Sequence, residues 1–185
     1  MSNDAAFILY IATTLDGYVA SSDGGIEWLT SLETQDEDSG YTAFYETIDA
    51  LIMGAATYKK VLGFGDWVYA SKLSYVLTHR NLSSDRDDVV FTNTIEAVVE
   101  DVHRKGFKRV WIVGGGKVAS LFMTRGLVDE YILTIVPVIL GTGISLYQSV
   151  PEQKLRLVKT RTFASGAVEL QYEKSNHNST ESPTF

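Results

Sequence analysis

Three consecutive glycines stand between a predicted strand and a predicted helix. An apolar run over residues 110–113 leads directly into Gly114, Gly115 and Gly116, and Lys117 follows. Consecutive glycines leave backbone N–H groups open to a ligand, and the first turn of a helix adds partial positive charge, so the junction suits an anion such as a pyrophosphate. The spacing is not that of a P-loop, and the glycines come too late for the opening turn of a Rossmann unit. A tight structural turn is the alternative interpretation.

Two further predicted strand ends carry groups that bind phosphate. One apolar run ends at Gly54, and Thr57 is placed to cap the helix that follows. Another run ends at Thr78, His79 and Arg80, and a guanidinium can pair with a phosphate through two hydrogen bonds. A plain helix cap and a solvated arginine are the alternatives. Ligands of α/β sheets gather at the carboxyl ends of strands, so the three strand ends together predict an anion-binding cleft.

The turn after the first apolar run and the acidic stretch beyond it hold the candidate proton donors. They are Asp16, which precedes Gly17, and Glu33. A carboxyl group buried beside a substrate can transfer a proton, whereas a plain turn and a solvated acidic loop are the alternatives. The three histidines have no metal-ligand spacing, so no metal site is expected.

Apolar runs that alternate with helical patterns must position these residues. A helix that starts near Thr94 carries its apolar residues at helical spacing, and it ends at Gly106. Strand–helix alternation predicts an α/β fold with a mixed, mostly parallel sheet, and a short turn ending in Gly166 predicts a C-terminal antiparallel hairpin. The strands are predicted over residues 7–13, 50–53, 73–77, 89–91, 110–113, 130–136, 155–163 and 167–173, and the helices over about 41–48, 57–61, 94–105 and 117–125.

Composition excludes several classes of protein. The chain has 185 residues, a formal net charge of −7 and no cysteine. Disulfides, Cys-type zinc sites, iron–sulfur clusters and thiol nucleophiles are therefore excluded, and the acidic balance argues against binding to nucleic acid or to a membrane surface. We expect one domain over residues 1–173, a disordered polar tail over 174–185 and, by default, a cytoplasmic location.

Taken in order, four segments resemble dihydrofolate reductase-like proteins, in particular the bacterial branch that shares the riboflavin-biosynthesis reductase (C-terminal) domain. The segments are residues 14–20, 52–58, 113–118 and 136–143, and the resemblance spans about residues 7–172. It implies a three-layer α/β domain around a mixed sheet of eight or nine strands. It also implies NADPH as cofactor, with NADH or a flavin less favoured.

The resemblance also implies roles for particular residues. Gly114, Gly115, Gly116, Lys117 and Val118 match the pyrophosphate turn. The remaining cofactor positions are Ala12 and Gly17 beside the nicotinamide, Gly54, Ala55 and Thr57 at the phosphates, and Thr78, His79 and Arg80 at the adenosine 2′-phosphate. Trp28, Tyr41, Tyr45 and Thr134 match substrate positions. Ala55 replaces an arginine that is usual in the family.

These residues predict an NADPH-dependent oxidoreductase. A hydride would pass to a C=N or C=C–N bond of a pterin-, folate- or pyrimidine-like heterocycle, and Asp16 or Glu33 would assist as the catalytic acid. The alternatives are a riboflavin-pathway 5-amino-6-(phosphoribosylamino)uracil reductase and a non-catalytic module that binds a nucleotide or a flavin. The partner is a small-molecule substrate, and the hairpin edge could pair in a homodimer.

Overall fold

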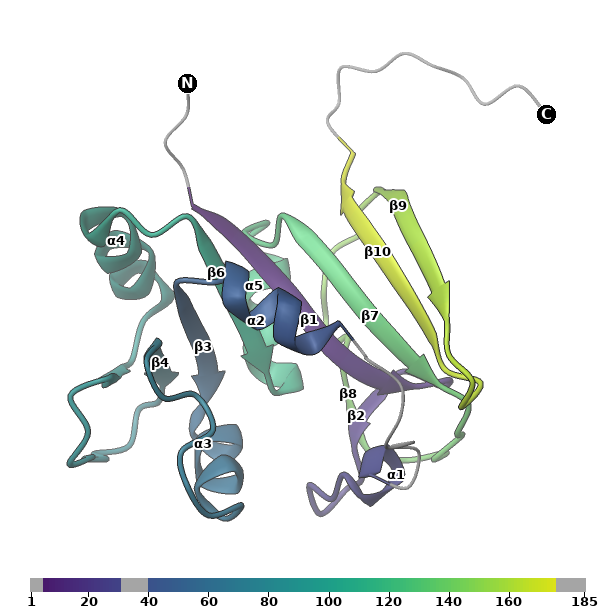
Figure 1. The fold of residues 1–185 in the computed structure, drawn as a ribbon, viewed down its shortest axis with the longest axis horizontal. Helices are drawn as coiled ribbons and strands as arrows, with labels where there is room; N and C mark the ends of the chain where they lie inside the picture. The colour runs from purple at the N-terminus through teal and green to yellow at the C-terminus, as the bar shows by residue number, and fades with distance from the viewer. Residues whose placement is uncertain (1–4, 31–39, 176–185) are drawn as a thin grey trace.

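A mixed β-sheet forms the middle of the computed structural model, which describes residues 5–30 and 40–175 (Figure 1). Within these residues eight strands form the main sheet in the order β5-β4-β3-β6-β1-β7-β10-β9. Neighbours from β5 to β7 are parallel, whereas β10 is antiparallel to both β7 and β9. The strands are β1 (Ala6–Thr14), β3 (Ala50–Gly54), β4 (Leu73–Leu77), β5 (Val89–Thr92), β6 (Arg109–Gly114), β7 (Glu130–Val136), β9 (Leu155–Thr162) and β10 (Val168–Lys174). The predicted mixed sheet and C-terminal hairpin are confirmed.

Helices cover both faces of this sheet and give the molecule three layers (Figure 1). They are α1 (Glu27–Thr30), α2 (Tyr41–Thr47), α3 (Ala55–Leu62), α4 (Ile95–Lys105) and α5 (Gly116–Thr124). Helices α4 and α5 pack on one face, and α2 and α3 pack on the other. Because parallel strands with helices on both faces are buried on both sides, their sequences are continuously apolar, which is the pattern that identifies them.

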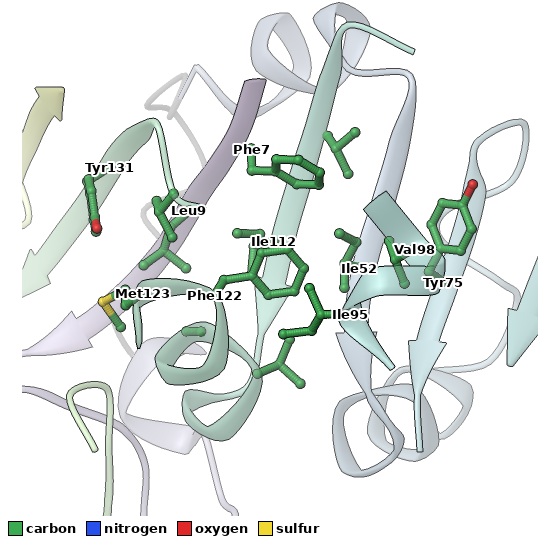
Figure 2. Packing of buried hydrophobic residues seen from close by; sticks show 14 of the residues in the cluster. Phe7, Leu9, Ile52, Tyr75, Ile95, Val98, Ile112, Phe122, Met123 and Tyr131 are labelled. Carbon is green, nitrogen blue, oxygen red and sulfur yellow. The ribbon is translucent and has the colours of Figure 1, made fainter. Parts of the chain in front are cut away.

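The core between α4, α5 and the sheet is closely packed around Phe122 (Figure 2). The Phe122 ring is fully buried and lies 5.5 Å from the ring of Phe7. Helix α4 contributes Ile95, Val98 and Val102, which share its buried face as their spacing predicts. The Thr94 hydroxyl accepts a hydrogen bond from the Ala97 N–H, and so begins this helix as expected.

The structure differs from the sequence-based expectations at three places. Helix α3 begins at Ala55 with Gly54 as its N-cap, so Thr57 lies inside the first turn and the prediction that it caps the helix is wrong. A small sheet of β2 (Tyr18–Ala20) and β8 (Ile144–Ser145), together with the single-turn α1, was not predicted because each is too short to show a period. Strand β10 runs to Lys174, one residue into the predicted tail, and residues 176–185 lie outside the described part of the chain.

Candidate functional site

A cleft of about 900 Å³ opens at the carboxyl ends of the parallel strands. It runs from the ends of β4 and β3, across the glycine turn after β6, to the end of β1. Loops at this edge are free to carry polar groups while the buried strands fix their positions. The three predicted strand ends therefore meet in one cavity, although no single stretch of sequence contains it.

The glycine turn has one open side, and that side faces α3. A side-chain Cβ at Gly116 would lie 2.3 Å from the Ser145 carbonyl oxygen. Close packing against β8 is therefore sufficient to explain the glycine at this position. At Gly115 the Cβ would lie 3.5 Å from Thr57 Oγ1, an ordinary contact, and the Gly115 φ of −68° suits any residue. The absent Gly115 side chain thus leaves a cradle between the turn and α3. Backbone N–H groups and the α5 N-terminus make this cradle fit a pyrophosphate.

The end of β4 supplies polar groups at one extremity of the cleft. Thr78 and His79 line it, together with Asn93 after β5. Thr78 Oγ1 accepts a hydrogen bond from the Arg80 N–H at 3.0 Å, which shapes the turn. The Arg80 side chain is exposed and stands outside the lining, whereas Lys117 in the first turn of α5 is part of it. Cationic and hydroxyl groups at this extremity suit the phosphates of a nucleotide.

Asp16 forms hydrogen bonds that connect the turn after β1 to the loop at residues 140–141, and it does not line the cleft. Its carboxylate accepts hydrogen bonds from Thr14 Oγ1 at 2.6 Å, the Gly141 N–H at 2.7 Å and the Leu140 N–H at 3.2 Å. The Thr14 hydroxyl and these two backbone N–H groups lower the pKa of Asp16. A carboxylate that is ionised and already bonded is a poor proton donor. The structure thus gives no support to a catalytic Asp16 and places this residue as a loop anchor.

The anchored loop places one wall of the cleft. Gly17 has a φ of +81°, which favours glycine, and its carbonyl accepts a hydrogen bond from the Leu146 N–H at 3.0 Å. Strand β2 follows and contributes Val19 and Ala20 to the lining, opposite Ala12 of β1. Gly17 itself supports the wall from outside the cavity.

Aromatic rings line the cleft on the α2–α3 face of the sheet. Tyr10, Tyr69 and Trp111 line it, and the Tyr69 and Trp111 rings meet edge to face with centroids 5.6 Å apart. The Trp111 indole N–H donates to the Tyr10 carbonyl at 2.9 Å, which fixes that ring. We refer to Tyr10, Tyr69 and Trp111 as the aromatic wall. Flat apolar rings of this kind suit a planar ligand.

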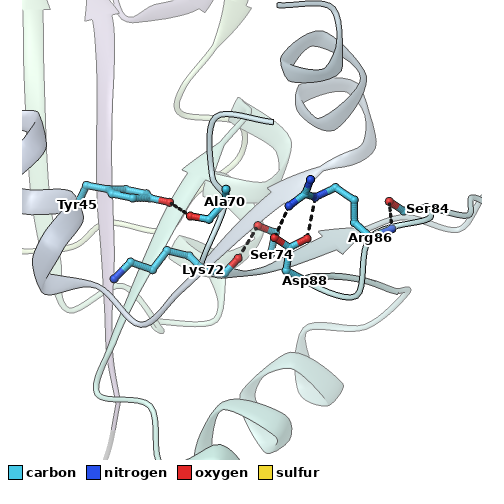
Figure 3. A network of polar contacts seen from close by, with 7 residues as sticks. All are labelled: Tyr45, Ala70, Lys72, Ser74, Ser84, Arg86 and Asp88. Atoms are coloured by element: carbon cyan, nitrogen blue, oxygen red, sulfur yellow. Dashed lines mark hydrogen bonds and ion pairs between the residues drawn. The ribbon is translucent and has the colours of Figure 1, made fainter. Parts of the chain in front are cut away.

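The segment that carries Tyr69 is held by a polar network between α2 and the strands β4 and β5 (Figure 3). The Tyr45 hydroxyl donates to the Ala70 carbonyl at 3.4 Å, and Lys72 Nζ donates to the Ile48 carbonyl at 2.6 Å. The guanidinium of Arg86 pairs with Asp88 at 2.6 Å farther along the same network. Tyr45 is therefore a support for the aromatic wall rather than part of it.

The remaining predicted residues divide by position. Gly54, Ala55, Thr57, Trp28 and Val118 line the cleft as expected. Other predicted residues lie apart from the lining, namely Gly114, Tyr41 and Thr134. Thr134 faces Ala12 in the register of β1 and β7, and Tyr41 stacks on Tyr45 with centroids 5.9 Å apart. Glu33 lies outside the described residues.

Sequence reasoning missed Tyr10, Tyr69, Trp111 and Leu121, all of which line the cleft. Tyr10 and Trp111 lie inside buried strands, where an aromatic residue indicates a core and nothing more. Leu121 is 44% exposed on a helix whose other apolar residues are buried, and only the folded structure distinguishes it from them. An exposed leucine one helical turn after the glycines can cover the flat base of a nucleotide.

Two titratable side chains in the lining are poor acids at neutral pH. Hydrogen bonds from the Ser21 hydroxyl and then the Gly25 N–H lower the pKa of Asp23. Burial raises the pKa of Tyr69, so its phenol stays neutral. Over residues 5–30 and 40–175, His, Asp and Glu form no group of three that could hold a metal ion.

Comparison with known proteins gives a consistent result. Residues 5–168 match the family model described as the RibD C-terminal domain. The chain is 37% identical over 171 residues to the uncharacterized protein YwjB of Bacillus subtilis, with 91% of this chain and 97% of YwjB covered. Among the helices of the described residues, none combines the length and apolar character that a membrane crossing requires.

Solved structures show the same fold. A protein of Shewanella sp. PV-4 provisionally assigned to riboflavin biosynthesis superposes with a TM-score of 0.85 at 30% identity, covering 92% of this chain and 99% of that one. The diaminohydroxyphosphoribosylaminopyrimidine deaminase/5-amino-6-(5-phosphoribosylamino)uracil reductase of Thermotoga maritima superposes with a TM-score of 0.68 at 20% identity. That match covers 93% of this chain and 57% of the Thermotoga protein, and it shows the fold alone.

Proposed function

The chain belongs to the RibD C-terminal domain family, and from that premise we propose that it is an NADPH-dependent reductase of a planar pterin-, folate- or pyrimidine-like heterocycle. One observation carries the proposal. A single cleft holds polar groups that can bind phosphate, an unfilled glycine cradle and an aromatic wall. A dinucleotide needs the first two, and a planar acceptor beside its nicotinamide needs the third.

Each part of the cleft has a task in this reaction. The Gly115 cradle and Lys117 would hold the pyrophosphate, while Thr78, His79 and Arg80 would hold the 2′-phosphate. Because the first turn of α3 carries Ala55 and no charged side chain, recognition of the 2′-phosphate depends on the end of β4. Leu121 would cover the adenine. These contacts fix the cofactor so that its reactive ring meets the acceptor at the end of β1.

The chemistry that bound NADPH would supply is a hydride for a new C–H bond, with the π electrons of the acceptor C=N moving to nitrogen and NADP⁺ left as the oxidised product. The protein would align the acceptor against the aromatic wall. Val19 and Ala20 of β2, which line the cleft, would limit the access of solvent to it. The nitrogen also takes a proton. Asp23 and Tyr69 are poor acids here, so we infer that water at the mouth of the cleft supplies it. Glu33 stays a proposal from the sequence.

The proposal is tested by binding first and turnover second. NADPH is titrated while tryptophan fluorescence is recorded, because Trp28 and Trp111 line the cleft. Loss of reduced-nicotinamide absorbance is then followed with dihydropterins, dihydrofolate and pyrimidines. Saturable binding with turnover of one of these classes is the expected result. Saturable binding without turnover would favour a non-catalytic nucleotide-binding module, and absence of binding would refute the cofactor assignment.

A further inference from the structure

The charges of this chain are distributed unevenly along the sequence. The first 58 residues contain ten aspartates and glutamates and no lysine, arginine or histidine, and the first basic residue is Lys59. These 58 residues include β1, β2, α1 and α2, and they form the β1–β2 side of the cleft. That side therefore has no cation of its own to offer a ligand.

The basic side chains among the described lining residues are Lys60, His79 and Lys117, and each is assigned a role other than binding the acceptor. His79 follows β4 and Lys117 opens α5, both at the end proposed for the cofactor phosphates. Lys60 of α3 reaches across the mouth, where its Nζ donates to the Gly24 carbonyl at 2.7 Å. Its charge also helps lower the pKa of Asp23, after the larger effects of Ser21 and Gly25. Lys60 is thus already matched within the protein.

The acceptor end is instead uncharged and aromatic. Tyr69 and Trp111 are 7% and 5% exposed, and both rings pack in an edge-to-face cluster with Trp67, Phe44 or each other. Trp28 and Leu29 line the cleft on its β1–β2 side, where α1 lies next to β2 (Figure 1). An anion placed against these rings would lose hydration, and the described lining offers it no basic side chain beyond Lys60, His79 and Lys117, so its binding is disfavoured.

We propose that the acceptor is a planar heterocycle that carries no phosphate or carboxylate. The inference rests on the proposed function and narrows it, because it sets aside phosphoribosyl pyrimidines and folates with their glutamate tail. A dihydropterin or a ribosyl pyrimidine without phosphate keeps the same reducible C=N group as its anionic counterpart. Stacking on the aromatic wall then provides recognition in place of ion pairs.

Matched pairs of substrates test this directly. One pair is 6-methyl-dihydropterin and dihydrofolate, and the other is 5-amino-6-(ribosylamino)uracil and its 5′-phosphate. Within each pair the reducible C=N group is unchanged. The second member of the pyrimidine pair adds only a phosphate, and dihydrofolate adds an aminobenzoyl group with an anionic glutamate. At saturating NADPH we expect kcat/KM for the uncharged member to be at least about tenfold higher than for the anionic member, because the anionic member has the higher KM. Salt screens charges, so this ratio of kcat/KM values should be smaller at high salt. An equal or higher value for the anionic member would overturn the inference.

A charge variant with its neutral control tests the cause. Leu29 is half-buried in the lining, so Leu29→Lys adds a cation to the lining and Leu29→Met preserves the volume without charge. We expect Leu29→Lys to raise kcat/KM for the anionic member of a pair about fivefold or more relative to Leu29→Met. If the two variants treat the anionic member alike, the lack of a cation is not what excludes it and the inference fails.

Binding measurements separate this inference from the proposed function. Tryptophan fluorescence reports binding of each pair member to the complex with NADP⁺, whether or not turnover occurs. Tighter binding of the uncharged member without reduction would support the inference and refute the reductase. Reduction of both members with equal KM would support the reductase and refute the inference, and absence of both binding and turnover would refute both.

Discussion

One methyl group added at Gly115 should weaken the binding of NADPH and leave the stability of the fold almost unchanged. In Gly115→Ala the new Cβ lies 3.5 Å from Thr57 Oγ1, and the φ of −68° is open to alanine. The free protein should accept this methyl group with a stability change below about 1 kcal/mol. The methyl group nevertheless fills the space between the turn and α3 where the pyrophosphate is proposed to lie.

The expected loss of affinity follows from the contacts that the methyl group displaces. Hydrogen bonds to a charged group are each worth about 1.5–3 kcal/mol, so displacing one phosphate oxygen raises the Kd for NADPH about 10- to 150-fold. The Kd is measured by tryptophan fluorescence and the stability by urea denaturation. Gly116→Ala is the contrasting variant, because its Cβ would lie 2.3 Å from the Ser145 carbonyl oxygen and should destabilise the fold by about 1–3 kcal/mol.

Two results would refute this reasoning. If Gly115→Ala binds NADPH within twofold of the wild-type protein, the pyrophosphate does not lie in the cradle. If Gly115→Ala loses as much stability as Gly116→Ala, the glycine turn is structural and its open side is not a ligand site.

Three further predictions concern the loop anchor, the cofactor phosphate and the core. Hydrogen bonds from Thr14 and from backbone N–H groups lower the pKa of Asp16 in the folded protein, so this carboxylate stabilises the fold above its ordinary pKa of 3.8. That stabilisation is lost as the pH falls through the lower pKa of the folded state. Unfolding measured against pH should therefore show Asp16→Ala less stable than wild type near neutral pH and equal to it in strong acid. Arg80→Ala should weaken NADPH about tenfold or more and leave NADH unchanged, as fluorescence titration of both cofactors would show, and equal effects on the two would contradict the assignment. Phe122→Ala should cost about 3–5 kcal/mol in urea denaturation, since this ring is fully buried, and a cost below 1 kcal/mol would contradict the packing.

The sequence predicts the parts of this protein whose signal is local. Buried parallel strands read as apolar runs, and Thr94 and Gly106 mark the ends of α4 by residue type alone. The turn at Gly115 is also visible, because a strand, three glycines and a helix are consecutive. These local signals suffice for the layer order and for the glycine turn at which the cofactor phosphates are proposed to lie.

The aromatic wall could not be predicted, because its residues come from three separate parts of the chain. In chain order Tyr10, Tyr69 and Trp111 are separated by about 60 and then about 40 residues. They meet only when β1 and β6 pair and the segment before β4 folds back against them. The hydrogen bonds of Asp16 could not be predicted for a related reason, since its partners Leu140 and Gly141 lie in a loop far away in the sequence. The predicted homodimer and the role of Glu33 stay predictions.

The transfer of labelled hydride tests the central claim most directly. The protein is incubated with an uncharged dihydropterin and with NADPH that carries deuterium on one or the other face of the nicotinamide C4. The mass of the reduced pterin is then measured by mass spectrometry. A fixed cofactor in the cleft predicts that the acceptor gains one deuterium from one labelled form and none from the other. A product that gains no deuterium from either form, or equal amounts from both, would contradict the account.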